Sequence, residues 1–317
     1  MSKRPIAVYY EHPRWFERVF NELDRRHIAY EKVDAAHHHY DLLSNGNHKY
    51  SLIFNRMSPS AWTRGNAHSI FYTLNYLEHA EQSGTRVVNG SHAFRVETSK
   101  ALQLSLLQSL GLPYPRSRVI NHASQAAAAA QGLRFPIVIK PNIGGSGAGI
   151  VRYDSVEQIA NAAANNKIDL GLDNIGLVQE YVPAKDGHIV RVETIGYKYL
   201  YAIKVFTSGE TFDLCPADIC KTVDGTELNT SCVIEGPKSG LRVEAYQPPA
   251  SIIADVERIF AAAKIEVGGV EYMVDARDGK HYYYDINALS NFVADGPTLL
   301  GFDPFQRLVD YLEREAA

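Results

Sequence analysis

The chain has 317 residues, of which 45% are hydrophobic and 21% charged, a composition typical of a folded protein with two or three small domains. Its formal net charge of -4 provides no excess of basic residues to neutralise a phosphate backbone, so we exclude nucleic acid as a partner. The apolar run at 6–10 is too short for a signal peptide or a spanning helix, so we expect a cytoplasmic protein without a membrane partner.

The first ninety residues alternate between strand and helix patterns, which predicts an α/β domain over 1–92. Phe16, Val19, Phe20 and Leu23 recur at helical spacing and are expected in the core. The predicted elements are a strand at 6–10, a helix at 15–26, strands at 29–33 and 52–55, a helix at 71–81 and a strand at 86–89.

Two further units follow, at 93–185 and 186–317, so the expected fold is an N-terminal α/β domain and two α+β subdomains. A helix at 98–110, closed by Gly111 and Pro113, leads into the second unit. That unit has strands at 117–120, 137–140, 150–153 and 177–180 and helices at 124–131 and 156–165. The third has strands at 190–196, 199–206, 269–274 and 282–286, a helix at 252–264 and a last helix after Pro304.

A glycine-rich loop follows the buried strand that ends at Lys140. Glycines let backbone N–H groups approach phosphate oxygens, and the lysine adds a positive charge. The β-branched residues after the loop form a strand, which excludes a Rossmann turn, and the absence of Gly-Lys-Ser/Thr excludes a P-loop. A phosphate-covering hairpin and a hairpin without a ligand both remain open. The loop residues concerned are Gly144, Gly145, Ser146, Gly147 and Gly149.

Two later segments carry further polar signals. The strand at 177–180 ends in Gln179 and Glu180 and is followed by Tyr181 and Val182. The backbone of these four residues could bind the edge of an adenine, or the segment could be the end of an ordinary strand.

The second of these segments is a hairpin turning at Asp278-Gly279, with Glu271 on one strand and Asp285 and Asn287 on the other. Residues two apart on a strand share a face. Two carboxylates and an amide oxygen suit Mg²⁺, although a solvated acidic hairpin is equally compatible with the pattern.

In order and spacing, these three segments resemble the ATP-grasp superfamily, above all its RimK-like and D-alanine–D-alanine-ligase-like carboxylate-amine ligases. The resemblance covers most of the chain and implies an ATP-grasp fold whose two subdomains enclose ATP and Mg²⁺, with Mn²⁺ as an alternative ion. It also implies amide-bond formation between a small-molecule carboxylate and an amine, such as an amino acid or peptide, through an acyl phosphate, with release of ADP and phosphate. A homo-oligomer is left open.

The resemblance also implies roles for single residues. Lys100 and Lys140 would contact the nucleotide phosphates beneath the glycine-rich loop, with Lys140 also assisting phosphoryl transfer. Arg191 and Lys204 would lie near the acyl phosphate, and Arg191 would stabilise the oxyanion. The adenosine contacts would be Gln179, Glu180, Tyr181 and Val182 for the adenine and Asp186 for the ribose.

The metal ligands implied are Glu271, Asp285 and Asn287, where the family commonly has Asp, Glu and Asn. The family's Ser-Pro-Gly turn after the asparagine is also replaced, and Ser290 and Asn291 become candidate substrate contacts. These departures favour one alternative, an ATP-binding regulatory protein without turnover. A small-molecule kinase, which would use the same nucleotide site and differ only in its product, is a second alternative.

Three further groups of residues are less informative. Arg56 could bind a substrate carboxylate or be a surface arginine. The histidines at 37–39 cannot all ligate one ion from a strand, so a solvated or substrate-lining loop is expected. Cys215, Cys220 and Cys232 lack paired spacing and are expected to be ordinary thiols.

Overall fold

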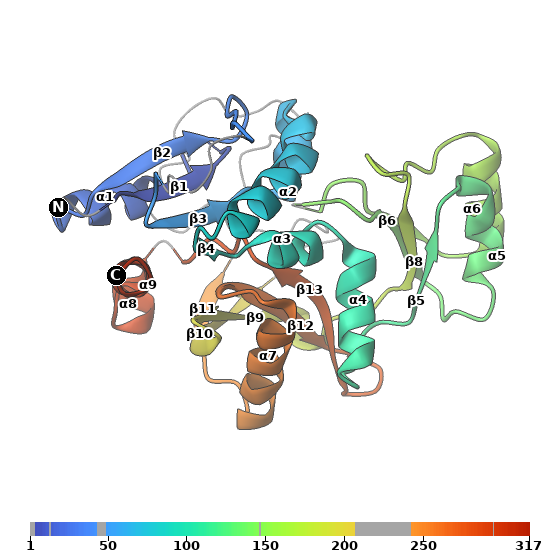
Figure 1. The fold of residues 1–317 in the computed structure, drawn as a ribbon. Coiled ribbons are helices and arrows are strands. Elements are labelled where there is room, and N and C mark those ends of the chain that lie inside the picture. The colour runs from blue at the N-terminus through green and yellow to red at the C-terminus, as the bar shows by residue number, and fades with distance from the viewer. Residues whose placement is uncertain (1–3, 13, 43–48, 146, 207–241, 294) are drawn as a thin grey trace.

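The computed structural model describes residues 4–12, 14–42, 49–145, 147–206, 242–293 and 295–317. Ser146 and the three cysteines therefore lie outside the described residues. Strands and helices are mixed around three sheets (Figure 1), which confirms the predicted α/β class. Within the described ranges, no helix has both the length and the apolar character needed to cross a bilayer.

The N-terminal domain is a parallel sheet with strand order β2-β1-β3-β4. Alternate residues of β1 face opposite sides: Val8 packs in the cluster that contains Leu23 of α1, and Tyr9 packs in the cluster that contains Leu77 of α2. Helices thus cover both faces, as a parallel sheet requires. The elements are β1 (Ile6–Tyr10), α1 (Glu17–Arg25), β2 (Tyr30–Asp34), β3 (Leu52–Arg56), the 3₁₀ helix η1 (Pro59–Arg64), α2 (Ala67–Gln82) and β4 (Val87–Val88).

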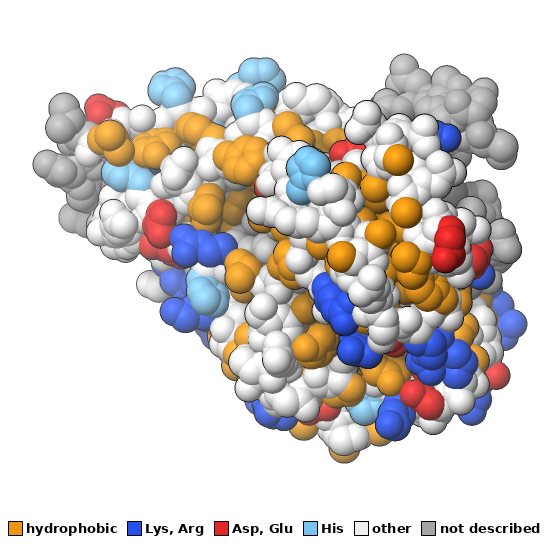
Figure 2. All heavy atoms as spheres, turned by 90° about the vertical axis from the view of Figure 1, so that its right-hand side faces the viewer, with side chains coloured by type: hydrophobic (Ala, Val, Ile, Leu, Met, Phe, Trp, Pro, Cys, Tyr) orange, Lys and Arg blue, Asp and Glu red, His pale blue; other side chains and the backbone are white. Residues whose placement is uncertain are grey.

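The second sheet is antiparallel, with order β5-β8-β6-β7, and α5 and α6 cover one of its faces. Ile137 and Ile139 of β6 face these helices, so Lys140, at the adjacent position, faces the other side. On the side of the molecule that lies at the right in Figure 1, hydrophobic, basic and acidic side chains are interspersed on the surface (Figure 2). The elements are β5 (Ser117–Ile120), η2 (Ala123–Gln125), α5 (Ala126–Ala130), β6 (Ile137–Pro141), β7 (Val151–Tyr153), α6 (Val156–Ala164) and β8 (Gly176–Glu180).

The third sheet has the order β11-β10-β9-β12-β13, and α7 packs against one face. Val190 and Val192 of β9 face α7, so Arg191 between them faces away from it. The chain ends in α9, which packs beside α1, where Arg26 pairs with Asp310 at 2.5 Å. The elements are η3 (Lys185–Gly187), β9 (His188–Ile195), β10 (Lys198–Phe206), β11 (Val243–Tyr246), α7 (Ala250–Ala263), β12 (Val267–Val274), β13 (His281–Asn287), α8 (Gly296–Leu300) and α9 (Pro304–Glu315).

The predicted helix at 98–110 corresponds to α4 (Lys100–Ser109), but the helix before it, α3 (Ser91–Glu97), was not predicted. Thr98 and Ser99 separate the two helices. Ser99 has extended backbone angles and its hydroxyl accepts a hydrogen bond from Leu102 N, which makes it the N-cap of α4. This break places Lys100 at the first position of a helix. The strand β11 and the helix α8 were not predicted, because each is short.

Asn89 joins the N-terminal domain to the third sheet. Its side-chain nitrogen donates to Val267 O at 2.7 Å and to Ala288 O at 2.8 Å, and its side-chain oxygen accepts from the N–H groups of Glu266 and Val267. The residue is 1% exposed and has a positive φ of 56°. All four hydrogen bonds are made by one buried side-chain amide, so a single substitution at Asn89 would remove them together.

Replacing Asn89 with alanine should lower the free energy of unfolding by about 3 kcal/mol, because buried backbone groups would lose their partners. Chemical denaturation measures this change. Asn166→Ala is the control, since Asn166 is exposed and has a similar φ of 52°. An equal loss in both variants would mean that the backbone conformation, and not the four bonds, carries the effect.

Candidate active site

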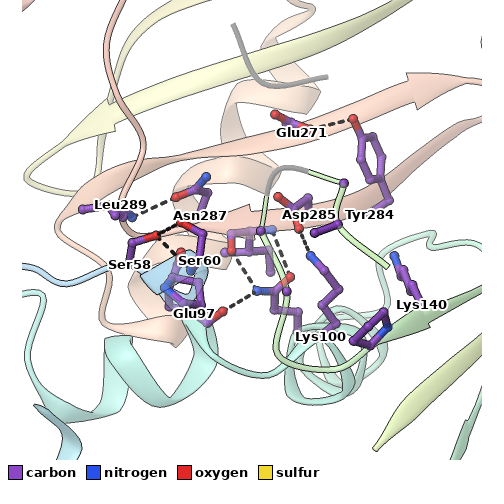
Figure 3. A pocket seen from close by; sticks show the side chains of 18 of the residues that line it. Ser58, Ser60, Glu97, Lys100, Lys140, Glu271, Tyr284, Asp285, Asn287 and Leu289 are labelled. Atoms are coloured by element: carbon purple, nitrogen blue, oxygen red, sulfur yellow. Dashed lines mark hydrogen bonds and ion pairs between the residues drawn. The ribbon is translucent and has the colours of Figure 1, made fainter. Parts of the chain in front are cut away.

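A cavity of about 140 Å³ lies where the N-terminal domain, the glycine-rich loop and the third sheet meet (Figure 3). Ser58 and Ser60 of the N-terminal domain line one side. The start of α4 and the end of β6 contribute Lys100 and Lys140. The third sheet contributes the face that is not covered by α7. Residues far apart in the sequence therefore line one small cavity.

Strand register brings three charged side chains into one row on the floor of the cavity. Arg191 on β9 lies opposite Glu271 on β12, and Glu271 lies opposite Asp285 on β13. Directly opposed residues share a face, and Asn287 follows two positions later on the same face. The Nη1 atom of Arg191 lies 3.9 Å from Glu271 Oε1.

A β-bulge in β13 adds a tyrosine to this row. The register shifts between Glu271 and Tyr272, so Tyr284 is an extra residue on β13. Tyr284 and Asp285 therefore both line the cavity although they are adjacent in sequence. The Tyr284 hydroxyl donates to Glu271 Oε2 at 2.6 Å. Bulges of this kind are frequent beside active sites because they redirect a side chain.

The two carboxylates and the amide offer oxygen atoms of the type that Mg²⁺ prefers. Across the described part of the chain, no three His, Cys, Asp or Glu side chains come together in a group able to hold a metal. The set here has only two carboxylates, and its third member is Asn287. Burial, followed by the charge of Asp285, raises the pKa of Glu271 to about 7. A cation bound between two such carboxylates would reduce the repulsion between their negative charges.

Lys100 and Lys140 supply the opposite charge. Lys100 Nζ lies 2.5 Å from Asp285 Oδ1. Burial favours the neutral form of both groups, but their mutual attraction outweighs it, raising the pKa of Lys100 and lowering that of Asp285. Lys140 is buried without such a close partner, so burial and the neighbouring Lys100 charge lower its pKa to about 7.

The glycine-rich loop closes against the N-terminal domain. A Cβ atom on Gly145 would lie 2.7 Å from Ser60 Cβ, closer than real Cβ contacts allow, so this approach requires glycine. Gly147 and Gly149 have φ values of 70° and 76°, which glycine adopts without strain. Gly144, Gly145 and Gly147 line the cavity. The predicted antiparallel hairpin is confirmed by the pairing of β6 with β7.

Several predicted nucleotide contacts lie away from this cavity. Gln179 donates from its side chain to Ser117 Oγ at 2.8 Å, and Glu180 accepts from Arg134 N at 2.8 Å. The carbonyl of Tyr181 accepts from Arg277 at 3.0 Å. Val182 is buried, and Asp186 has a positive φ of 56°. These residues lie around the end of β8, whose neighbour β6 carries Lys140.

Lys204 lies on the opposite face of the sheet from Arg191. It pairs with Val190 of β9, which faces α7, and its ammonium lies 4.8 Å from the centre of the Tyr246 ring. Lys204 therefore does not share a face of the sheet with Arg191, although their strands pair as expected. Its place near the acyl phosphate stays a prediction.

Arg56 is neither a surface residue nor part of the cavity lining. It is 4% exposed, and its guanidinium donates to Ala288 O at 3.2 Å and to Ser290 O at 2.7 Å. The surface alternative for Arg56 is therefore wrong, because the residue is buried and anchors the loop after β13. Its contact with a substrate carboxylate stays a prediction. In that loop Asn291 lines the cavity, and Ser290 lies behind it and contacts Arg191.

Sequence reasoning missed Glu97 and Glu193. Glu97 lines the cavity and accepts a hydrogen bond from Ala288 N, and burial raises its pKa to about 7. It was overlooked because α3, the helix that ends at Glu97, was not predicted. Glu193 lies two residues after Arg191 on one strand, a spacing that could have placed both on the same face. The histidines at 37–39 lie elsewhere, beside a second cavity in the N-terminal domain.

Comparison with known proteins identifies the fold. Residues 97–212 match the RimK-like ATP-grasp domain. This protein has the ATP-grasp fold. Its structure superimposes on D-alanyl-alanine synthetase A from Vibrio cholerae with a TM-score of 0.70 and 15% identity, covering 100% of this chain and 99% of that one.

Two other matches agree with this fold. The ATP-grasp ligase PsnB, in complex with a variant of its minimal precursor, Mg and ADP, gives a TM-score of 0.67 at 18% identity over 100% of both chains. A D-alanine–D-alanine ligase from Haemophilus influenzae is 28% identical over 114 residues, which are 34% of this chain and 36% of that protein. The alignments with these curated relatives span only 16% to 36% of the relatives' own length.

Lys140 provides a prediction about pH. Its pKa in the folded protein is about 7, against 10.5 for an ordinary lysine, so between these pH values the unfolded chain holds a proton that the folded chain has released. Stability therefore rises with pH across this window. Lys140→Met should remove this rise and stabilise the ligand-free protein at pH 7 by about 2 kcal/mol.

Denaturation at several pH values between 7 and 10 measures the effect. Lys167→Met is the control, since Lys167 is exposed. If both variants keep the pH dependence of the original protein, Lys140 is not the buried neutral lysine inferred here.

Proposed function

We propose that this protein is an ATP-dependent ligase that joins a carboxylate to an amine through an acyl phosphate, releasing ADP and phosphate. One observation supports this above all: Arg191, Glu271, Asp285 and Asn287 form a row that faces Lys100 and Lys140 within a single cavity. Cations, carboxylates and a glycine-rich loop are what phosphoryl transfer requires, because that chemistry rests on positioning and charge stabilisation.

One group of cavity residues would bind the nucleotide, and a second group would bind the metal ion. Lys100, Lys140 and the glycine-rich loop would hold the phosphates of ATP, while Glu271, Asp285 and Asn287 would hold Mg²⁺ or Mn²⁺. The cation would neutralise charge on the phosphate oxygens. Lys100 would exchange its present partner, Asp285, for a phosphate. The residues around the end of β8, from Gln179 to Val182, together with Asp186, remain our proposal for the adenosine.

In the first step, an oxygen of the substrate carboxylate attacks the γ-phosphorus of ATP, and the bond to the β-γ bridging oxygen breaks to give ADP and an acyl phosphate. The two lysines stabilise the negative charge on the transferring group. In the second step, the amine attacks the acyl carbon, and the guanidinium of Arg191 stabilises the tetrahedral oxyanion. Phosphate then leaves, the nitrogen loses its proton and the amide remains.

The similarity to D-alanine–D-alanine ligase and to PsnB supports an amino acid or a peptide as substrate. A carboxylate would enter between Arg191 and the N-terminal residues Ser58 and Ser60. We also propose that the chain divides at residues 92 and 185, so that the first unit contributes mainly to substrate binding.

Release of ADP by the purified protein tests the proposal, with Mg-ATP and pooled carboxylates in the presence and absence of pooled amines. ADP release should require a carboxylate and increase with an amine. Release that needs only a carboxylate, with a stable phosphorylated product, would indicate a kinase. Binding of ATP without release of ADP in any pool would indicate a regulatory protein.

Asp285→Asn and Lys140→Ala should each lower ADP release at least 100-fold, because one removes a metal-binding charge and the other a phosphate-binding charge. Asp278→Asn, in the exposed turn of the same hairpin, should retain normal release. Circular dichroism would establish that the variants are folded. Near-normal turnover in both cavity variants would exclude the proposed site.

A further inference from the structure

Arg191 is held by a carboxylate and a hydroxyl that lie behind the cavity. Its Nε donates to Glu193 Oε1 at 2.7 Å and to Ser290 Oγ at 3.1 Å, and its Nη2 also donates to Ser290 Oγ. The Ser290 hydroxyl in turn donates to Glu193 Oε1. The Nε–Nη2 edge of the guanidinium is thereby fixed, and Arg191 lines the cavity.

The neighbouring strand leaves room for this arrangement. Gly269 on β12 lies opposite Glu193 on β9. A Cβ atom at Gly269 would lie 2.8 Å and 2.9 Å from the Glu193 carboxylate oxygens and 2.9 Å from Ser290 Oγ. Any side chain at this position would displace the carboxylate or the hydroxyl. The glycine is therefore a spatial requirement of the contact between Glu193, Ser290 and Arg191.

The N-terminal domain fixes the position of Ser290. Arg56 donates to the carbonyls of Ala288 and Ser290, so it holds the backbone of the loop that carries the hydroxyl. The contact with Arg191 thus depends on the packing of the first domain against the third sheet.

The stability of the fold does not by itself explain a glutamate at position 193. It is 1% exposed, and its Oε2 atom is buried without a hydrogen-bond partner among the described residues. Burying a carboxylate costs several kcal/mol, and well-packed apolar residues often replace buried ion pairs without loss of stability. The carboxylate therefore calls for a role other than stabilisation, and its contact with Arg191 Nε provides one.

We propose that Glu193 is a positioning residue that, together with Ser290, aims the guanidinium of Arg191 into the cavity. Its effect on catalysis rests on the proposed function, whereas its effect on Arg191 does not. Without Glu193 the arginine would sample several rotamers, and a misplaced cation stabilises an oxyanion poorly.

The test follows the Nε–H signal of Arg191 by NMR in arginine-labelled protein, assigned through its loss in Arg191→Lys. In the original protein this proton should exchange slowly with water, because it is buried and hydrogen-bonded. Glu193→Ala should accelerate its exchange at least tenfold. Glu193→Gln, which keeps an oxygen acceptor, should have an intermediate effect.

The chain offers a matched control in Arg242 and Glu244. These residues also lie two apart and form an Nε to Oε1 bond of 2.7 Å, but they are solvent-exposed. Glu244→Ala should leave the Arg191 signal unchanged. If Glu193→Ala does not fold, Glu193→Gln and Ser290→Ala, each of which removes only part of the contact, provide the comparison.

Turnover gives a second, separable result. Where the original protein releases ADP, Glu193→Ala should lower kcat at least tenfold and change the KM for ATP less than twofold. An unchanged Arg191 exchange rate in the folded glutamate variants, or an unchanged kcat, would overturn the proposal. If the original protein shows no turnover, the ligase assignment fails, and the NMR comparison still decides the role of Glu193.

Discussion

The ion pair between Lys100 and Asp285 connects the two walls of the cavity. Lys100 begins α4, which follows the N-terminal domain, and Asp285 lies on the last strand of the third sheet. Each group alone would pay a large desolvation cost, and each keeps its charge because the other is near. The charge of Lys100 also acts on Lys140, whose pKa is lowered to about 7 first by burial and then by this neighbouring charge.

Strand register determines what the rest of the floor contains. Arg191, Glu271 and Asp285 come from three strands and meet because they occupy opposed positions. The bulge at Tyr284 places a hydroxyl against Glu271 that strict alternation would have turned away. A row of this kind is rigid, because the position of each side chain is set by backbone pairing and by its neighbours.

The N-terminal domain completes the site. Asn89 and Arg56 bind backbone groups of the third sheet and of the loop that follows it, and the glycine-rich loop contacts Ser60. The domain therefore both borders the cavity and holds the position of Ser290. The fold itself is shared with ATP-grasp structures that are only 15% to 18% identical to this chain. Packing and register can be retained while most surface residues change.

The sequence by itself determined the α/β class, the glycine-rich hairpin after Lys140 and the face shared by Asp285 and Asn287. These features follow from local spacing, because the repeat periods of strands and helices determine which side chains lie on the same face. Only the tertiary structure decided that Lys204 faces away from Arg191, that Arg56 is buried beneath a loop, and that Glu97 and Glu193 belong to the site. Those outcomes depend on which residues of distant strands lie opposite one another. Local periodicity cannot specify that register, because a shift of one residue leaves each strand's own pattern intact and reverses its faces.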